Sequence, residues 1–228
     1  MNLGVTDRLR PLLDAVNTFI DERVLPVDDE FLAEVGNGDR WSLNDRQTEI
    51  LEGLKTAARE QGLWNFWLTD SERGCGLSTV EYAYIAEATG RSYLAAEAFN
   101  CSAPDTGNME VLERFGSEQQ KREWLEPLLD GRIRSAYAMT EPGVASSDAT
   151  NISTTAVLED GEWVINGEKT YISGAGDHRC RILICMALTN PDADRHRQHS
   201  QILVPMDAPG VEVVRPMGVF GDDHAPHG

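Results

Sequence analysis

Apolar residues in the first 130 or so positions recur every three or four residues, the spacing that puts them on one face of an α-helix. The first run spans 7 to 25, and we expect Pro26 to end it. Further helices are predicted at about 44 to 60, from Ser78 to Gly90, from Pro104 to near Phe115, and from Ser117 to just before Gly131. Ser78 and Ser117 each precede an acid or amide by three residues, which is the pattern of a capping box.

The period then shortens to two residues, as in β-strands. Strands are predicted at 134 to 140, 153 to 158, 163 to 166, 169 to 173, 181 to 188, 201 to 206 and 211 to 215. Asp160-Gly161 and Asn166-Gly167 are signals for tight hairpins, which join antiparallel strands. We therefore predict an α+β chain of two domains. A helical bundle should span residues 1–133, and an antiparallel β-barrel or sandwich-like domain 134–228.

The C-terminal residues 221–228 have a loop composition and follow a strand, so we expect the β-domain to be incomplete at that end. The loop-like residues 36–41 are expected to separate the first two helices.

Composition narrows the classes of partner. The 228 residues carry a net charge of −18, which opposes nonspecific binding to nucleic acid or anionic membranes. No run reaches the roughly 18 apolar residues of a membrane span. We therefore expect no nucleic-acid or membrane partner. The N-terminus lacks an apolar leader and the four cysteines form no CxxC pair, so we expect a cytoplasmic protein with free thiols.

Several familiar sites are not supported. The chain has no P-loop, and Gly174-Ala175-Gly176 lacks the third glycine and the βαβ context of a dinucleotide site. The histidine pairs 196/199 and 224/227 lie in polar, loop-like segments, where solvated side chains are more probable than metal ligands. We predict no metal site.

Two segments could bind a flat polar heterocycle. Residues 137–148 leave a strand and enter a turn with the hydroxyls of Thr140, Ser146 and Ser147, which could hydrogen-bond the edge of such a ring. Residues 163–174 form a predicted hairpin in which Tyr171 and Ser173 share one face. Taken alone, the first segment is better explained as an ordinary turn whose hydroxyls cap the local backbone, and the second as an ordinary amphipathic hairpin.

In this order, however, "YAMTEP…SSD" and "W-x-I-N-G-x-K-x-Y-I-S-G" resemble the paired flavin-binding signature of the acyl-CoA dehydrogenases. The helical stretch 99–131 and the segment "HRQHSQILVPMDAPGVEVVRPMGVFG" resemble the same family. The variant "ASSDATN", together with "HRQ…VPMDAPG", resembles in particular the branch of members ten and eleven. The resemblance covers nearly the whole chain. It implies an FAD-dependent oxidoreductase that forms an α,β double bond in acyl-CoA thioesters.

The resemblance also implies residue roles. FAD would contact Tyr137, Met139, Thr140, Ser146, Ser147, Tyr171 and Ser173, with Tyr171 in place of a usual tryptophan and Ser173 in place of a usual threonine. The acyl-CoA pocket would be bordered by Phe99, Asn100, Asp105, Asn108 and Met109, with Ser147 near the thioester's pantetheine. Asp105 and Asn108 could equally be helix caps.

In this family a glutamate removes the α-proton while the β-hydride passes to the flavin, and that glutamate lies in a C-terminal helical domain. We expect that domain to be absent from the 228 residues and the chain to be a truncated form, inactive alone. Glu141 is not expected to be the base, because it matches an acid of the flavin turn. Expected partners are acyl-CoA, an acceptor such as electron-transfer flavoprotein, and further subunits in a homo- or hetero-oligomer. The alternatives are a subunit whose partner supplies the base and a non-catalytic acyl-CoA-binding protein.

Overall fold

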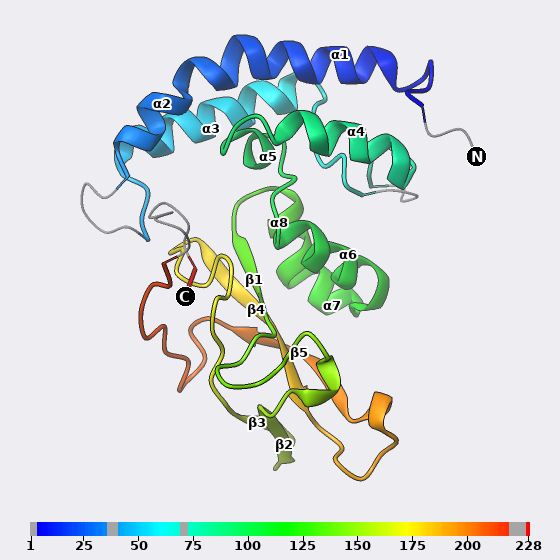
Figure 1. Cartoon of the computed structure of the whole chain (residues 1–228), viewed down its shortest axis with the longest axis vertical. Helices are drawn as coiled ribbons and strands as arrows, with labels where there is room; N and C mark the ends of the chain where they lie inside the picture. The colour runs from blue at the N-terminus through cyan, green and yellow to red at the C-terminus, as the bar shows by residue number, and fades with distance from the viewer. Residues whose placement is uncertain (1–3, 36–40, 69–72, 219–226) are drawn as a thin grey trace. The chain divides into compact units, whose positions relative to one another are not determined.

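The computed structural model describes residues 4–35, 41–68, 73–218 and 227–228. Most of the two predicted loops, 36–41 and 221–228, falls outside these residues. The chain divides into two compact units, Met1–Gly116 and Ser117–Gly228 (Figure 1).

The first unit is helical. Its elements are α1 (Arg10–Phe19), the π-helical turn η1 (Ile20–Val24), α2 (Leu25–Ala33), α3 (Asp45–Glu60), α4 (Thr79–Thr89), α5 (Ala95–Ala98) and α6 (Asp105–Phe115). Helix α1 packs against α4, and α2 packs against α3. The predicted start of α4 is confirmed: the Glu81 N–H donates to the Ser78 hydroxyl at 3.3 Å, and the Ser78 N–H donates to the Glu81 carboxylate at 2.9 Å.

The predicted end of the first helix at Pro26 is wrong. Helical structure continues to Ala33, with Pro26 as the second residue of α2. A proline is tolerated in the first turn of a helix, where its missing N–H has no intrahelical partner. The π-helical turn η1 comes immediately before α2, so the α-helical hydrogen-bond pattern restarts at Leu25.

The core of the first unit is aromatic at its centre. The ring of Phe99 lies 5.2 Å from that of Phe19 and 5.6 Å from that of Phe66, measured between centroids. All three side chains are buried, and tilted aromatic pairs at these separations contribute beyond their buried area. The turn between α5 and α6 is thereby anchored at Phe99.

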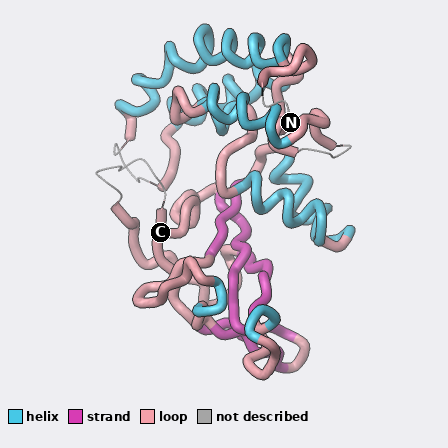
Figure 2. Tube along the Cα trace, turned by 45° about the vertical axis from the view of Figure 1, so that its right-hand side comes forward, coloured by secondary structure: helices cyan, strands magenta, loops and turns pink. Residues whose placement is uncertain are grey.

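The second unit begins with helices and continues with strands. Its elements are α7 (Glu118–Gln120), the π-helical turn η2 (Lys121–Leu125), α8 (Glu126–Leu129), β1 (Arg134–Ala138), the 3-10 turn η3 (Ala149–Asn151), β2 (Thr155–Glu159), β3 (Glu162–Asn166), β4 (Cys180–Leu188), the 3-10 turn η4 (Arg195–Arg197) and β5 (His199–Pro205). Long loops, pink in Figure 2, join the strands, which are magenta, except between β2 and β3. The secondary structure thus changes from helix to strand between Leu129 and Arg134.

The sheet is mixed, so the prediction of an antiparallel β-domain is wrong in part. Strand β4 pairs in parallel with β1 and, through Leu188, with Thr155 of β2, whereas the β2–β3 and β4–β5 pairs are antiparallel. A parallel pair requires a long connection, and the whole segment from Met139 to Arg179 separates β1 from β4. Among the described residues the sheet does not close into a barrel.

The predicted hairpin at Asp160-Gly161 is confirmed and joins β2 to β3. Both turn residues have positive φ, 51° and 89°, as a tight two-residue turn requires. Val157 pairs with Val164, and Leu158 pairs with Trp163. Neighbouring residues of a strand point to opposite faces, so each face of this ribbon carries one apolar pair. All four side chains are at least 40% exposed.

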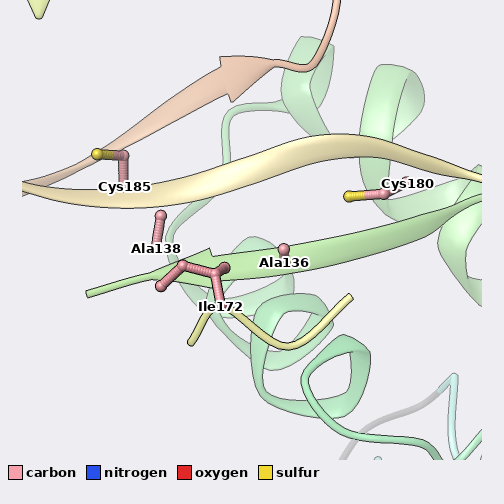
Figure 3. Close-up of a cluster of buried hydrophobic side chains, with 5 residues drawn as sticks. All are labelled: Ala136, Ala138, Ile172, Cys180 and Cys185. Carbon is pink, nitrogen blue, oxygen red and sulfur yellow. The ribbon is translucent and has the colours of Figure 1, made fainter. Parts of the chain in front are cut away.

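The second predicted hairpin, at Asn166-Gly167, is absent. Residues 167–179 contain no strand, and neither do residues 211–215. Tyr171 has a φ of 54°, which a bulky L-residue rarely adopts and which lies outside the β region that a strand needs. Tyr171 and Ser173 are exposed, whereas Ile172 between them lies in a buried cluster with Ala136, Ala138, Cys180 and Cys185 (Figure 3).

Candidate functional site

The two segments singled out in the sequence meet in the second unit. The Thr170 N–H donates to the carbonyl oxygen of Thr140 at 2.9 Å. One residue earlier, the ammonium of Lys169 donates to the carbonyl oxygen of Met139 at 3.1 Å. The loop that follows β3 therefore lies along the end of β1, although its residues do not form the strand that we predicted.

Beneath this contact lies a buried ion pair between Glu141 and Lys169. Lys169 Nζ lies 2.8 Å from Glu141 Oε1, which also accepts the Thr154 N–H at 2.8 Å. Glu141 Oε2 accepts the Ser153 N–H at 2.8 Å and the Ser153 hydroxyl at 2.6 Å. Burial raises the pKa of Glu141, but the hydrogen bonds from Lys169, Ser153 and Thr154 outweigh it, and the pKa is far below the ordinary carboxyl value.

Glu141 is therefore an ionised structural group. The sequence interpretation likewise set Glu141 apart from the base, and that remains a prediction. Lys169 was not among the predicted site residues. A lysine in an alternating strand pattern normally reads as a solvent-facing position, and its acidic partner lies too far away in the sequence to be recognised as a partner.

Four of the predicted cofactor residues expose their functional groups. Thr140, Ser147 and Ser173 are exposed, and so is Tyr171, at 53%. In the described part of the chain, none of these four hydroxyls has a hydrogen-bond partner. Thr140 and Tyr171 belong to the two segments that the Thr170 to Thr140 bond joins. The site thus offers hydroxyl groups and an aromatic face to a ligand.

The other three predicted cofactor residues are engaged within the protein. The Ser146 hydroxyl accepts the Glu141 N–H at 3.3 Å, so Ser146 caps the turn, as the simpler interpretation of this segment proposes. The Tyr137 hydroxyl accepts a hydrogen bond from Gln201 at 3.1 Å, and burial raises the pKa of Tyr137. Met139 contributes its carbonyl to Lys169.

The turn that carries Ser147 is held by its neighbours. Asp148 accepts from the Thr150 N–H and hydroxyl at 3.0 and 2.6 Å. Arg195 donates to both Asp148, at 2.8 Å, and Thr150, at 2.9 Å. The hydrogen bonds from Thr150, with Arg195 and His196 nearby, lower the pKa of Asp148. Ser147 is therefore presented from an ordered turn beside η3.

Of the six predicted substrate residues, Ser147 is exposed in the second unit, and the other five lie in the first unit and are buried. They are Phe99, Asn100, Asp105, Asn108 and Met109, each no more than 6% exposed. Asn100 donates its side-chain amide to Asn65 Oδ1 at 2.7 Å, and the Asn65 N–H donates to the Phe99 carbonyl at 3.0 Å. Both asparagines have a φ of 55°, which asparagine tolerates better than most residues. Pro104 occupies the N-cap position of α6, ahead of Asp105.

Within the described ranges, no three His, Cys, Asp or Glu side chains gather in a way that could hold a metal ion. The described helices also include none with the length and apolar character needed to cross a membrane.

Comparison with known proteins adds the family context. Residues 6–132 match the family described as acyl-CoA dehydrogenase, N-terminal domain, and residues 136–228 match acyl-CoA dehydrogenase, middle domain. The chain is 49% identical to acyl-CoA dehydrogenase family member 10 of Mus musculus over 99% of its own length and 21% of that protein.

Solved structures of acyl-CoA dehydrogenases also resemble this chain. A putative acyl-CoA dehydrogenase from Mycobacterium abscessus matches with a TM-score of 0.89 and 49% identity over 98% of this chain and 57% of that one. An acyl-CoA dehydrogenase from Bacillus anthracis, solved in complex with FAD, matches with a TM-score of 0.69 and 25% identity over 98% of this chain and 35% of that one.

Proposed function

Because this chain belongs to the acyl-CoA dehydrogenase family and comprises its N-terminal and middle domains, we propose that it binds FAD and takes part in the α,β-dehydrogenation of an acyl-CoA thioester. The proposed N-terminal domain spans residues 1–133 and the proposed middle domain spans 134–228. The chain covers about a fifth of its mouse relative, so the activity of the whole protein is part of this proposal.

The apposition of Thr140 with Thr170 and Tyr171 is the observation that supports FAD binding most directly. A flavin is a flat ring whose edge carries N–H and C=O groups. It needs an apolar or aromatic surface against the ring and hydroxyl or backbone groups at the edge. The Tyr171 ring offers the aromatic surface. The hydroxyls of Thr140 and Ser173, which lack partners in the described part of the chain, offer the groups for the ring edge. The donor set therefore fits the cofactor.

In the proposed reaction a bound flavin would supply the hydride acceptor, which no amino-acid side chain can supply. The side chains described above bind and orient. The Thr140 hydroxyl would donate to the ring edge, the Tyr171 ring would cover one part of the ring from water, and Ser147 would bond the thioester's pantetheine or a phosphate. Met139 and Ser146 would act through the backbone turn that they help to form.

The substrate side of the proposal involves the first unit. Phe99, Asn100 and Met109 would border the acyl chain, with Asp105 and Asn108 beside them. An electron acceptor such as electron-transfer flavoprotein and assembly with further subunits are proposed from the family alone.

FAD titration of the purified chain tests the proposal. Flavin fluorescence and absorbance should report saturable binding, weakened by Thr140→Val and by Tyr171→Ala. Two exposed residues of the first unit give matched controls: Thr56→Val and Tyr93→Ala should leave binding unchanged. Equal flavin affinity in all five proteins would rule out the assigned site. Binding of acyl-CoA without FAD would instead favour a non-catalytic acyl-CoA-binding protein.

A further inference from the structure

Lys169 holds a position that the proposed function does not explain. Its side chain is 12% exposed, and its ammonium contacts three acceptors from three parts of the second unit. These are the Met139 carbonyl at 3.1 Å, the Met186 carbonyl at 2.8 Å and the Glu141 carboxylate at 2.8 Å. An ammonium group has three N–H donors, so all of them are used.

The two carbonyls mark a specific point in the sheet. The last pair in the parallel ladder between β1 and β4 is Ala138 with Cys185. In the same register the next pair would be Met139 with Met186, and the Lys169 ammonium bonds the carbonyls of both residues. The Lys169 ammonium thus replaces the next backbone pairing between the two strands. It does so at the point where β1 separates from β4 and the chain continues into the turn that contains Thr140 and Glu141.

The surrounding contacts fix this arrangement from both sides. The Glu141 carboxylate, 3% exposed, anchors the ammonium and is itself anchored by Ser153 and Thr154. The Thr170 N–H, one residue after Lys169, bonds the Thr140 carbonyl. The carbonyls of Met139 and Thr140 are therefore both directed at the 169–170 segment, while the Thr140 side chain is left exposed.

We propose that Lys169 is a positioning residue of the flavin site. Its ammonium would hold the Met139–Thr140 backbone in the orientation that presents the Thr140 hydroxyl, and would hold the 169–171 segment beside it. This inference rests on the proposed function. The Lys169 ammonium itself is held by its three protein acceptors and would not contact the flavin.

The test separates positioning from stability. Lys169→Met keeps an unbranched side chain only one atom shorter but leaves the Glu141 carboxylate buried without a cation, so this variant should also lose stability. The double variant Lys169→Met/Glu141→Leu removes both charges, and buried pairs replaced in this way often retain stability. Lys121→Met is the matched control, because Lys121 is a partly buried lysine of the same unit, 20% exposed, paired with Glu118.

Two measurements are made on each protein: FAD affinity by flavin fluorescence, and hydrogen exchange of the Thr170 amide without ligand. In both Lys169 variants we expect FAD affinity to fall by about tenfold or more, as for a lost charged hydrogen bond, with faster exchange at Thr170. The double variant should show both the lower FAD affinity and the faster Thr170 exchange even when its melting temperature matches that of the unmodified chain. Lys121→Met should change neither quantity.

Each other outcome overturns one claim. Unchanged Thr170 exchange in the double variant would show that Lys169 does not hold the segment. Faster exchange with unchanged FAD affinity would show that the held segment is not part of the flavin site. An unmodified chain that binds no FAD would overturn the proposed function itself, and the role of Lys169 with it.

Discussion

Gly167 lies against Thr154 so closely that a Cβ atom at residue 167 would stand 2.2 Å from the Thr154 hydroxyl oxygen and 2.7 Å from its Cβ. Thr154 donates its N–H to Glu141, and Gly167 lies two residues before Lys169. The absence of a side chain at residue 167 therefore lets the loop approach β2 closely enough for the ammonium to reach its three acceptors.

Gly167→Ala should destabilise the second unit by roughly 1–3 kcal/mol, the usual cost of overpacking. Urea unfolding followed by tryptophan fluorescence would measure the loss. Gly218→Ala is the control, since a Cβ there meets no atom of the described residues within 4 Å. Equal stability of the two variants would contradict the close contact.

Glu141 should make stability depend on pH in the acid range. Its pKa is lowered in the folded chain, so its contribution is fully present above the unfolded value of about 4.5 and is lost as the pH falls toward the folded pKa. Glu141→Gln should be less stable than the unmodified chain at pH 7, and the gap should narrow below pH 4.5. Urea midpoints from pH 7 to pH 2 would test this. A parallel series with Glu123→Gln, at an exposed position, is the control.

Glu141 should not serve as the base that removes a proton from substrate. A base of this kind works best with a pKa near the working pH, whereas the Glu141 carboxylate is already bound by four donors and has a pKa far below that range. We expect the 228-residue chain, mixed with FAD, several acyl-CoAs and an artificial electron acceptor, to show no turnover above free FAD. Turnover by a preparation with no second protein in its mass spectrum would contradict this prediction.

Met109 tests the substrate side of the proposal. It is fully buried in α6, so Met109→Ala should cost about 2–5 kcal/mol of stability and leave space along the helix. If α6 borders the acyl pocket, the variant should shift binding toward longer acyl-CoAs, as measured by calorimetry with a chain-length series. Met109→Leu, which nearly conserves volume, should leave the preference unchanged. The same preference in all three proteins would remove α6 from the pocket.

The parts of the fold that were predictable depend on neighbours in sequence. Ser78 and Glu81 form their capping box within one helical turn, and Asp160-Gly161 closes a hairpin between adjacent strands. All the residues that form each of these two motifs lie within a few positions of one another in the sequence. The helix across Pro26 was missed because the π-helical turn η1 before it changes the hydrogen-bond pattern, and the residue pattern carries no sign of that turn.

The parts that were missed depend on residues far apart. The parallel pairing of β1 with β4 joins segments separated by a long connection, and no local pattern specifies such a partner. Neither the positive φ of Tyr171 nor the burial of Lys169 beside Glu141 is marked by a local sequence pattern. The motif resemblance implied the proposed cofactor residues, whereas the contacts of Lys169 with Met139, Glu141 and Met186 are visible only in the folded structure.

The apolar ribbon formed by β2 and β3 has a consequence for handling the protein in solution. Its two faces present Val157 with Val164 and Leu158 with Trp163 to water, and Glu159 faces Glu162 at the tip. With a net charge of −18 the molecules repel one another at low ionic strength, which keeps such ribbons apart. At about 0.15 M salt the Debye length is only about 8 Å. Colloidal stability should therefore decline as salt is added, and size-exclusion elution should shift toward larger species with ionic strength while the circular dichroism spectrum stays the same.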